Sequence, residues 1–135
     1  ATATAAQYAD LAERYATDTP VETGEVVSLG GKEEITKCMD DKSDAVFGVV
    51  SDHPAYLMNS EAGNNDTHPA IALKGRVPVR VAGKGSAGDR VISAGYGAAR
   101  VAAEGEATTF NTLGRLIKDK YNEETALTEC VIGVK

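Results

Sequence analysis

The clearest pattern in the chain is an alternation of apolar and polar residues over 70–82. The apolar side carries Ile71, Leu73, Val77, Val79 and Val81 with Gly75 in register, and the other side carries Lys74, Arg76, Pro78 and Arg80. Strict alternation of this length predicts a half-buried strand with one wet, basic face. We expect the apolar side chains to face the core. Arg76 and Arg80 should face solvent or a neighbouring subunit.

In two longer segments, 23–52 and 87–119, glycine, acidic and apolar residues occur in the same order. Each opens on a Gly-acid pair and closes on an apolar-Gly pair: Gly24-Glu25 and Phe47-Gly48 in the first, Gly88-Asp89 and Leu113-Gly114 in the second. A long unit that occurs only twice is not a solenoid. It predicts two related β-units within one domain. We expect Gly31 and Gly95 in matching turns, because tight turns often need the positive φ that glycine supplies.

Shorter apolar runs and turn residues predict the remaining strands. Pro78 cannot donate a ladder hydrogen bond, so strand 70–82 should lie at a sheet edge or carry a bulge there. The other expected strands cover 25–29, 34–38, 46–51, 89–93, 98–102, 112–118 and 127–134. The pattern as a whole predicts a mainly β domain, compact and barrel- or sandwich-like, with little helix.

The first segment of the chain fits two structures. Tyr8, Leu11, Ala12 and Tyr15 have the i, i+3, i+4, i+7 spacing of an amphipathic helix. In the second unit, however, a strand precedes the Gly-acid turn, and by analogy residues 8–15 should be extended. We expect the extended form because the repeat is the stronger constraint.

Composition limits the class of protein. The chain has 135 residues, of which 42% are hydrophobic and 25% charged, which suits one globular domain, 1–135, with its own core. Its net charge of −6 argues against nucleic acid or an anionic membrane as a partner, because both need a concentrated basic surface. No apolar run reaches 18 residues, so we expect no membrane insertion.

Residues 52–69 have no counterpart in the second unit. The apolar stretch Ala55–Met58 is expected to turn inward, and 61–68 is expected to be a polar loop. Loops of this length on a rigid β scaffold are often functional. The candidate binding residues are therefore Tyr56, Asn59, Ser60, Glu61, Asn64, Asn65, Asp66 and His68.

Several side chains fit a chemical role and also a plainer one. His53 and His68, with nearby carboxylates, fit a metal or acid–base cluster, but hydrogen-bonded His-Pro corners are the simpler interpretation. The trio 64–66 offers oxygen ligands for Ca²⁺ but only one carboxylate. We therefore expect no metal and no cofactor. Cys38 and Cys130 are too few for a zinc site and are expected to be buried thiols.

Two acidic residues, Asp10 and Glu13, are candidates for a catalytic carboxylate pair. On a helix they would share a face, whereas on a strand they would point to opposite faces. Solvated surface carboxylates are the simpler interpretation.

Short motifs along the chain resemble one family of phage domains. They are Ala6-Gln7-Tyr8-Ala9-Asp10-Leu11-Ala12-Glu13, Gly24-Glu25-Val26-Val27, Phe47-Gly48-Val49-Val50-Ser51, Pro54-Ala55-Tyr56-Leu57-Met58-Asn59-Ser60, Ala72-Leu73-Lys74-Gly75-Arg76-Val77-Pro78-Val79 and Gly88-Asp89. In order and spacing, from about Tyr8 to Val134, they resemble the C-terminal domains of bacteriophage tail fibres and appendages. That family is described as an intramolecular-chaperone autoproteolytic, or peptidase G2-like, domain.

This resemblance implies a structural role at a fibre tip. The domain would help three chains to fold in register as a homotrimer, and it would be attached to a fibre region that precedes it in the chain. The fibre would belong to a virion that is assembled in the host cytoplasm. Some relatives cut themselves off with acidic side chains near the start of the domain, where Asp10 and Glu13 lie. If cleavage falls just upstream, Ala1 is a cut end, and an engineered boundary explains Ala1 equally well. Binding of a host receptor or glycan through 59–68, Tyr56 or Tyr96, autoproteolysis, and capsid decoration are the alternatives.

Overall fold

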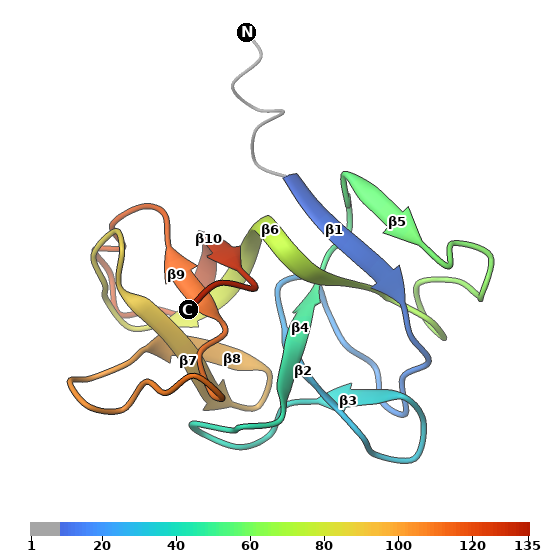
Figure 1. Ribbon diagram of the computed structural model, residues 1–135, viewed down its shortest axis with the longest axis horizontal. Helices are drawn as coiled ribbons and strands as arrows, with labels where there is room; N and C mark the ends of the chain where they lie inside the picture. Colours follow the sequence, from blue (N-terminus) through green and yellow to red (C-terminus); the bar gives the residue numbers. More distant parts are fainter. Residues whose placement is uncertain (1–8) are drawn as a thin grey trace, which may run out of the picture.

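The protein is an all-β structure over residues 9–135, which the computed structural model describes. Tyr8, which we placed in the first extended segment, lies outside the described residues. The described chain has no helix, and so none that could cross a membrane. Its strands are β1 (Ala9–Arg14), β2 (Val26–Leu29), β3 (Ile35–Lys37), β4 (Val46–Val50), β5 (Tyr56–Met58), β6 (Ala70–Ala82), β7 (Arg90–Gly95), β8 (Ala98–Val101), β9 (Gly114–Leu116) and β10 (Ala126–Ile132) (Figure 1).

Five of these strands close into a barrel. The pairing runs β6–β8–β7–β9–β10, and β10 returns to pair with β6. The expected barrel-like β domain is therefore confirmed. The barrel core contains buried side chains from all five strands, among them Val77, Val79, Val81, Val91, Ala99, Leu116, Cys130 and Ile132. Both cysteines are buried in this core and carry free thiols.

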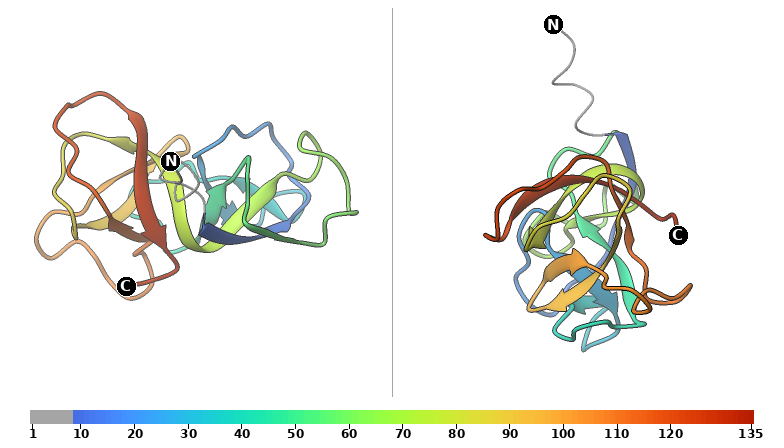
Figure 2. Two further views of the ribbon diagram at one scale, coloured as in Figure 1. Left: turned by 90° about the horizontal axis from the view of Figure 1, so that it is seen from above. Right: turned by 90° about the vertical axis from the view of Figure 1, so that its left-hand side faces the viewer.

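Strand β6 joins the barrel to the rest of the molecule. Its second half belongs to the barrel, and its first half pairs with β1 and β4. Seen from above, β6 runs from the barrel lobe into a second lobe that holds β1 to β5 (Figure 2). The second lobe has its own small core of Val27, Ile35, Val50 and Ile71, against which Tyr15, Val21, Phe47 and Leu73 pack.

Pro78 is accommodated without placing β6 at the edge of the sheet. The residue lies opposite Glu129 of β10. In a strand, the backbone N–H groups of residues i and i+2 point to the same side of the strand. The N–H of Arg80 points away from β10 and donates to the carbonyl of Gly24. The Pro78 nitrogen faces that same side, in the gap between the β4 and β8 pairings. Our expectation of an edge strand or a bulge at Pro78 was therefore wrong. Strand β6 is central in the sheet, and only a short stretch around Pro78 lacks a strand partner on one of its two sides.

The two faces of β6 are as expected in its second half but not in its first. Val77, Val79 and Val81 are fully buried, which confirms their inward orientation. Ile71 and Leu73 pack in the core of the second lobe instead, because a bulge shifts the β1–β6 register where Leu11 pairs with Lys74 and Ala12 with Ala72. Leu73 is the extra residue, and it reverses the alternation.

The segments 23–52 and 87–119 share their order of pairing. In the first, β2 lies between β3 and β4, and in the second, β7 lies between β8 and β9, with all four pairs antiparallel. Gly48 and Gly114 occupy the third strand of each unit. A Cβ atom there would lie 2.4 Å from the carbonyl oxygen of Ala72 and 2.0 Å from that of Val131, so both positions require glycine.

The opening turns of the two segments are also alike. Gly24 and Gly88 have φ of 84° and 92° and donate to the carbonyls of Val50 and Leu116, each at 2.8 Å. The carboxylates of the adjacent acids, Glu25 and Asp89, each accept the backbone N–H three residues earlier at 2.8 Å. Our expectation that Gly31 and Gly95 lie in matching turns was wrong. Both have positive φ, but Gly95 ends β7 whereas Gly31 lies beyond the end of β2 in a longer loop.

Substitutions on the two faces of β6 should have very different effects. Val79→Asp would bury an unpaired carboxylate and is expected to lower the free energy of unfolding by about 3 kcal/mol or more. Arg80→Ala removes a side chain that is 36% exposed and pairs with the exposed Glu22, so we expect a loss of about 1 kcal/mol or less. Urea denaturation of both variants measures the difference. Equal losses would contradict the assignment of the faces.

Candidate functional site

The inserted segment 52–69 forms the outer edge of the second lobe. Strand β5 pairs in parallel with β1 and has no other strand neighbour among the described residues. Leu57 and Met58 are half-buried, but Tyr56 is 64% exposed. The expectation that 55–58 turns inward was therefore wrong at Ala55 and Tyr56, which are both exposed, since β5 is an edge strand (Figure 1).

Arg14, at the end of β1, holds the loop that follows β5. Its guanidinium donates to the carbonyl of Ser60 at 3.1 Å, to Oδ1 of Asn65 at 2.9 Å and to the carbonyl of His68 at 2.7 Å. The side chain of Asn59 donates in return to the carbonyl of Arg14 at 3.4 Å. One cation thus fixes both ends and the middle of the loop 59–68. Arg14 was not among the residues that we predicted for this site.

The loop 59–68 is also folded on itself. Oδ1 of Asn64 accepts the backbone N–H groups of Asp66 and Thr67, both at 2.9 Å. Since Oδ1 of Asn65 accepts from Arg14, both amide oxygens of the possible Ca²⁺ trio already accept hydrogen bonds. Within residues 9–135 no group of three or more His, Cys, Asp or Glu residues is arranged to hold a metal ion.

The predicted binding residues of the insertion are mostly accessible to solvent. All of them are exposed except His68, which is half-buried. Nδ1 of His68 lies 3.0 Å from Oγ1 of Thr67, and Nδ1 of His53 lies 3.1 Å from the carboxylate of Asp52. Each histidine therefore has a partner at a neighbouring position in the sequence, as in a hydrogen-bonded His-Pro corner.

Asp10 and Glu13 lie on opposite faces of β1 and do not form a carboxylate pair. Glu13 accepts a hydrogen bond from the hydroxyl of Tyr15 at 2.9 Å. Asp10 is 2% exposed, and its Oδ1 accepts a long hydrogen bond, 3.4 Å, from the backbone of Ala55. Its Oδ2 and the neighbouring buried hydroxyl of Ser51 have no well-oriented hydrogen-bond partner within residues 9–135.

The surroundings of Asp10 disfavour its charged form. Burial raises the pKa of the carboxyl above its ordinary value, the negative charge of Asp52 adds to the rise, and the contacts with Ser51 and Ala55 oppose it only in part. A buried carboxyl with an unsatisfied oxygen is unusual in a protein core. It is the one member of the predicted acidic pair whose surroundings suit acid chemistry.

Arg76 and Arg80, the predicted interface residues, are partly exposed and have partners within the chain. Arg76 pairs with Glu129 at 3.0 Å. The Nε of Arg80 donates to the carbonyl of Thr23 at 2.9 Å, and its guanidinium lies 3.6 Å from the carboxylate of Glu22. Any contact with a neighbouring subunit would therefore add to these pairs.

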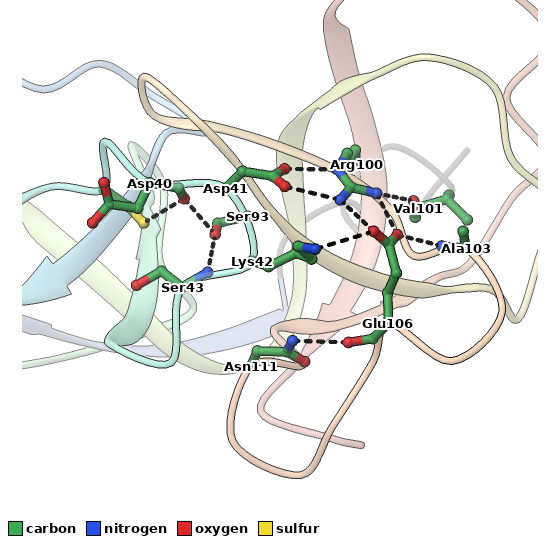
Figure 3. Close-up of polar contacts among 11 residues, drawn as sticks. Asp40, Asp41, Lys42, Ser43, Ser93, Arg100, Val101, Ala103, Glu106 and Asn111 are labelled. Carbon is green, nitrogen blue, oxygen red and sulfur yellow. Dashed lines mark hydrogen bonds and ion pairs between the residues drawn. The ribbon is translucent and has the colours of Figure 1, made fainter.

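A second polar cluster, which the sequence did not indicate, lies on the barrel lobe around Arg100. Its guanidinium binds both carboxylate oxygens of Asp41, at 2.8 and 3.1 Å, and both of Glu106, at 2.7 and 3.0 Å (Figure 3). These bonds lower the pKa of Glu106 to about 2. Ser93 adds hydrogen bonds with Asp40 and Ser43. The cluster fastens the loop after β3 and the segment after β8 to the barrel, which is a structural task.

Comparisons with known proteins place the fold among phage appendages. No family description and no curated protein matches the chain. Among solved structures, the C-terminal fragment of bacteriophage phi29 gene product 12 matches with a TM-score of 0.62 at 17% identity, over 93% of this chain and all of that fragment. Pre-mature phi29 gene product 12 matches with a TM-score of 0.64 at 16% identity, and 95% of this chain covers 22% of its length.

A third structure extends the comparison to another part of the same phage. The N base of the phi29 head fibre gp8.5 matches with a TM-score of 0.53 at 11% identity, over 89% of this chain and 91% of that one. At these identities the likeness concerns the fold. The chain therefore has a fold that occurs in phage fibre and appendage proteins.

The pH dependence of stability should expose the burial of Asp10. Because its folded-state pKa is raised, the folded protein holds this proton more tightly than the unfolded chain, and stability is lost as pH rises from about 3.8 through the raised value. Asp10→Asn removes that loss. We expect the variant to be more stable than the parent by about 1–3 kcal/mol at pH 7, with the difference shrinking toward pH 4. Urea denaturation at both pH values tests this, and a constant difference would contradict it.

Proposed function

We propose that this chain is the C-terminal domain of a bacteriophage fibre or appendage protein, where it brings three copies into register and caps the fibre. One observation carries the proposal: the chain reproduces the fold of the whole C-terminal fragment of phi29 gene product 12. The head fibre base has the fold as well, so the terminal position is taken from gene product 12. On this proposal the domain is a virion component.

The outer face of β1 and β5 is the surface that we assign to contact between copies. Leu11 and Tyr56 are register partners in this parallel pair, and both are exposed, at 37% and 64%. Side chains at paired positions lie on the same face of a sheet. An apolar pair of this kind is typical of the centre of an interface, where aromatic residues are enriched.

A compact domain at the end of a fibre has a clear physical benefit. The fibre segments of three chains must pair side by side, and their register can easily slip. Contacts between residues that are distant in sequence also form slowly. If the globular domains associate first, they raise the effective concentration of the fibre segments for one another. The domain then acts as an intramolecular chaperone for the segments attached to it.

The mass of the isolated domain in solution tests the proposal. Sedimentation at high micromolar concentration is expected to give three times the chain mass of 14.1 kDa. Tyr56→Asp should weaken assembly by at least about tenfold, since it places a charge in the contact. Tyr121→Asp alters another tyrosine, 80% exposed, outside this face and is the matched control. A strict monomer contradicts the proposal.

Autoproteolysis is a second candidate function, favoured by the surroundings of Asp10. Burial raises the pKa of the Asp10 carboxyl and so favours its protonated form. In that form the carboxyl can donate its proton to the amine that leaves when water adds to a peptide carbonyl and the C–N bond breaks. Glu13, on the other face and bonded to Tyr15, is not placed to share this task. We expect a longer chain, with its natural upstream residues, to be cut before this domain.

The cleavage experiment compares two conservative variants of that longer chain. Asp10→Asn should abolish the smaller product on a denaturing gel, because the amide cannot supply the proton. Glu13→Gln should still be cut. Cleavage that survives in Asp10→Asn would remove the candidate, and loss of cleavage in both variants would contradict the assignment to Asp10 alone.

A further inference from the structure

The tip of the β7–β8 hairpin carries a tyrosine in an unfavourable backbone conformation. Tyr96 and Gly97 are the two central residues of the turn, and both have positive φ, 54° and 80°. Such turns favour Asn, Asp or Gly at both positions, and positive φ in a bulky residue is an outlier. The side chain of Tyr96 is also 78% exposed, so no packing of the ring explains its presence.

The turn that presents Tyr96 is rigidly anchored. Gly97 donates to the carbonyl of Cys38 at 2.8 Å and accepts from the N–H of Val26 at 2.8 Å. A Cβ atom on Gly97 would meet the carboxylate of Glu25 at 2.9 Å, which shows how closely the turn lies on β2. The backbone that carries Tyr96 is therefore anchored by the two main-chain bonds of Gly97, the next residue.

A hollow of about 480 Å³ lies beside the ring. Tyr96 and Met39, which is 51% exposed, supply its apolar side. The polar groups around it belong to Asp18, Thr19, Lys32, Thr36 and Lys37. The pKa of the Asp18 carboxyl is lowered by the backbone N–H of Lys32 and, to a smaller extent, by the charge of the Lys32 ammonium, whereas Lys37 pairs with Glu25 at 3.4 Å.

We propose that this hollow is a saccharide subsite in which Tyr96 stacks against a pyranose ring. One face of a sugar ring presents C–H groups that suit an aromatic surface, and its edge carries hydroxyls that suit a hydroxyl or an ammonium group. A turn backbone that is anchored in advance loses little entropy when a ligand binds. The site adds a ligand to the proposed fibre-end role and does not depend on assembly of the domain.

The test separates binding from folding through the choice of variants. The domain is applied to an array of neutral and carboxylate-bearing oligosaccharides, and each hit is titrated by calorimetry. Tyr96→Phe keeps the ring and should retain binding. Tyr96→Asn should weaken binding by at least about tenfold through loss of the stacked ring, while its melting temperature rises because Asn-Gly suits this turn. Tyr121→Asn, at a tyrosine 80% exposed, should bind as the parent does.

Each other outcome overturns the proposal. No bound saccharide on the whole array would do so, and so would equal affinities of the parent and Tyr96→Asn. If no saccharide binds and Tyr96→Asn lowers the sedimenting mass, Tyr96 belongs to a contact between copies. A monomeric parent that binds a saccharide through Tyr96 would contradict the trimer but keep the subsite.

Discussion

The structure depends on one continuous strand that serves two cores. Strand β6 places Val77, Val79 and Val81 in the barrel and Ile71 in the second lobe. In a regular strand the apolar side chains at alternate positions all lie on one face of the sheet. To present them to two cores on opposite faces, the strand needs an irregularity that exchanges its inward and outward positions. The bulge at Leu73 provides that change. Gly75 follows at φ 113°, where a Cβ atom would lie 2.2 Å from the carbonyl oxygen of Ala9, so β1 can pair with β6 this closely only because the residue is glycine.

The two surfaces to which we assign binding, the face at Leu11 and Tyr56 and the hollow at Tyr96, are positioned by β1 and β2 of the second lobe. β1 carries Asp10 inward and Leu11 outward, and its last residue, Arg14, fixes the inserted loop. On the other side of the lobe, the backbones of Val26 and Cys38 hold the turn at Tyr96. The surface proposed for contact between copies and the surface proposed for a saccharide are thus built on separate strands, and one can change without the other.

Most of the strands could be predicted from the sequence, but several of their contacts could not. Alternation, glycine pairs and turn residues indicated the strands, the barrel- or sandwich-like β architecture and the extended first segment, which is a strand over 9–14. The reversal of faces at Leu73 depends on how β1 approaches, and no local pattern encodes that. Arg14 bonds to residues 46 to 54 positions later, and Arg100 reaches Asp41 across 59. Such pairs are visible only once the chain is folded. Composition did mark residues 61–68 as a polar loop, because their side chains cannot form a core, and these residues are exposed except His68.

Closure of the barrel has a consequence for solubility. Pairing of β10 with β6 satisfies the strands that would otherwise end the sheet, and within residues 9–135 the outer strands that remain are β3 and β5, each only three residues long. Short edges are poor templates for backbone pairing between molecules. Many copies can therefore be crowded together, as at the surface of a particle, without polymerising through their sheets. Association through side chains is then favoured over pairing between strands, and sequence changes can adjust such contacts one residue at a time.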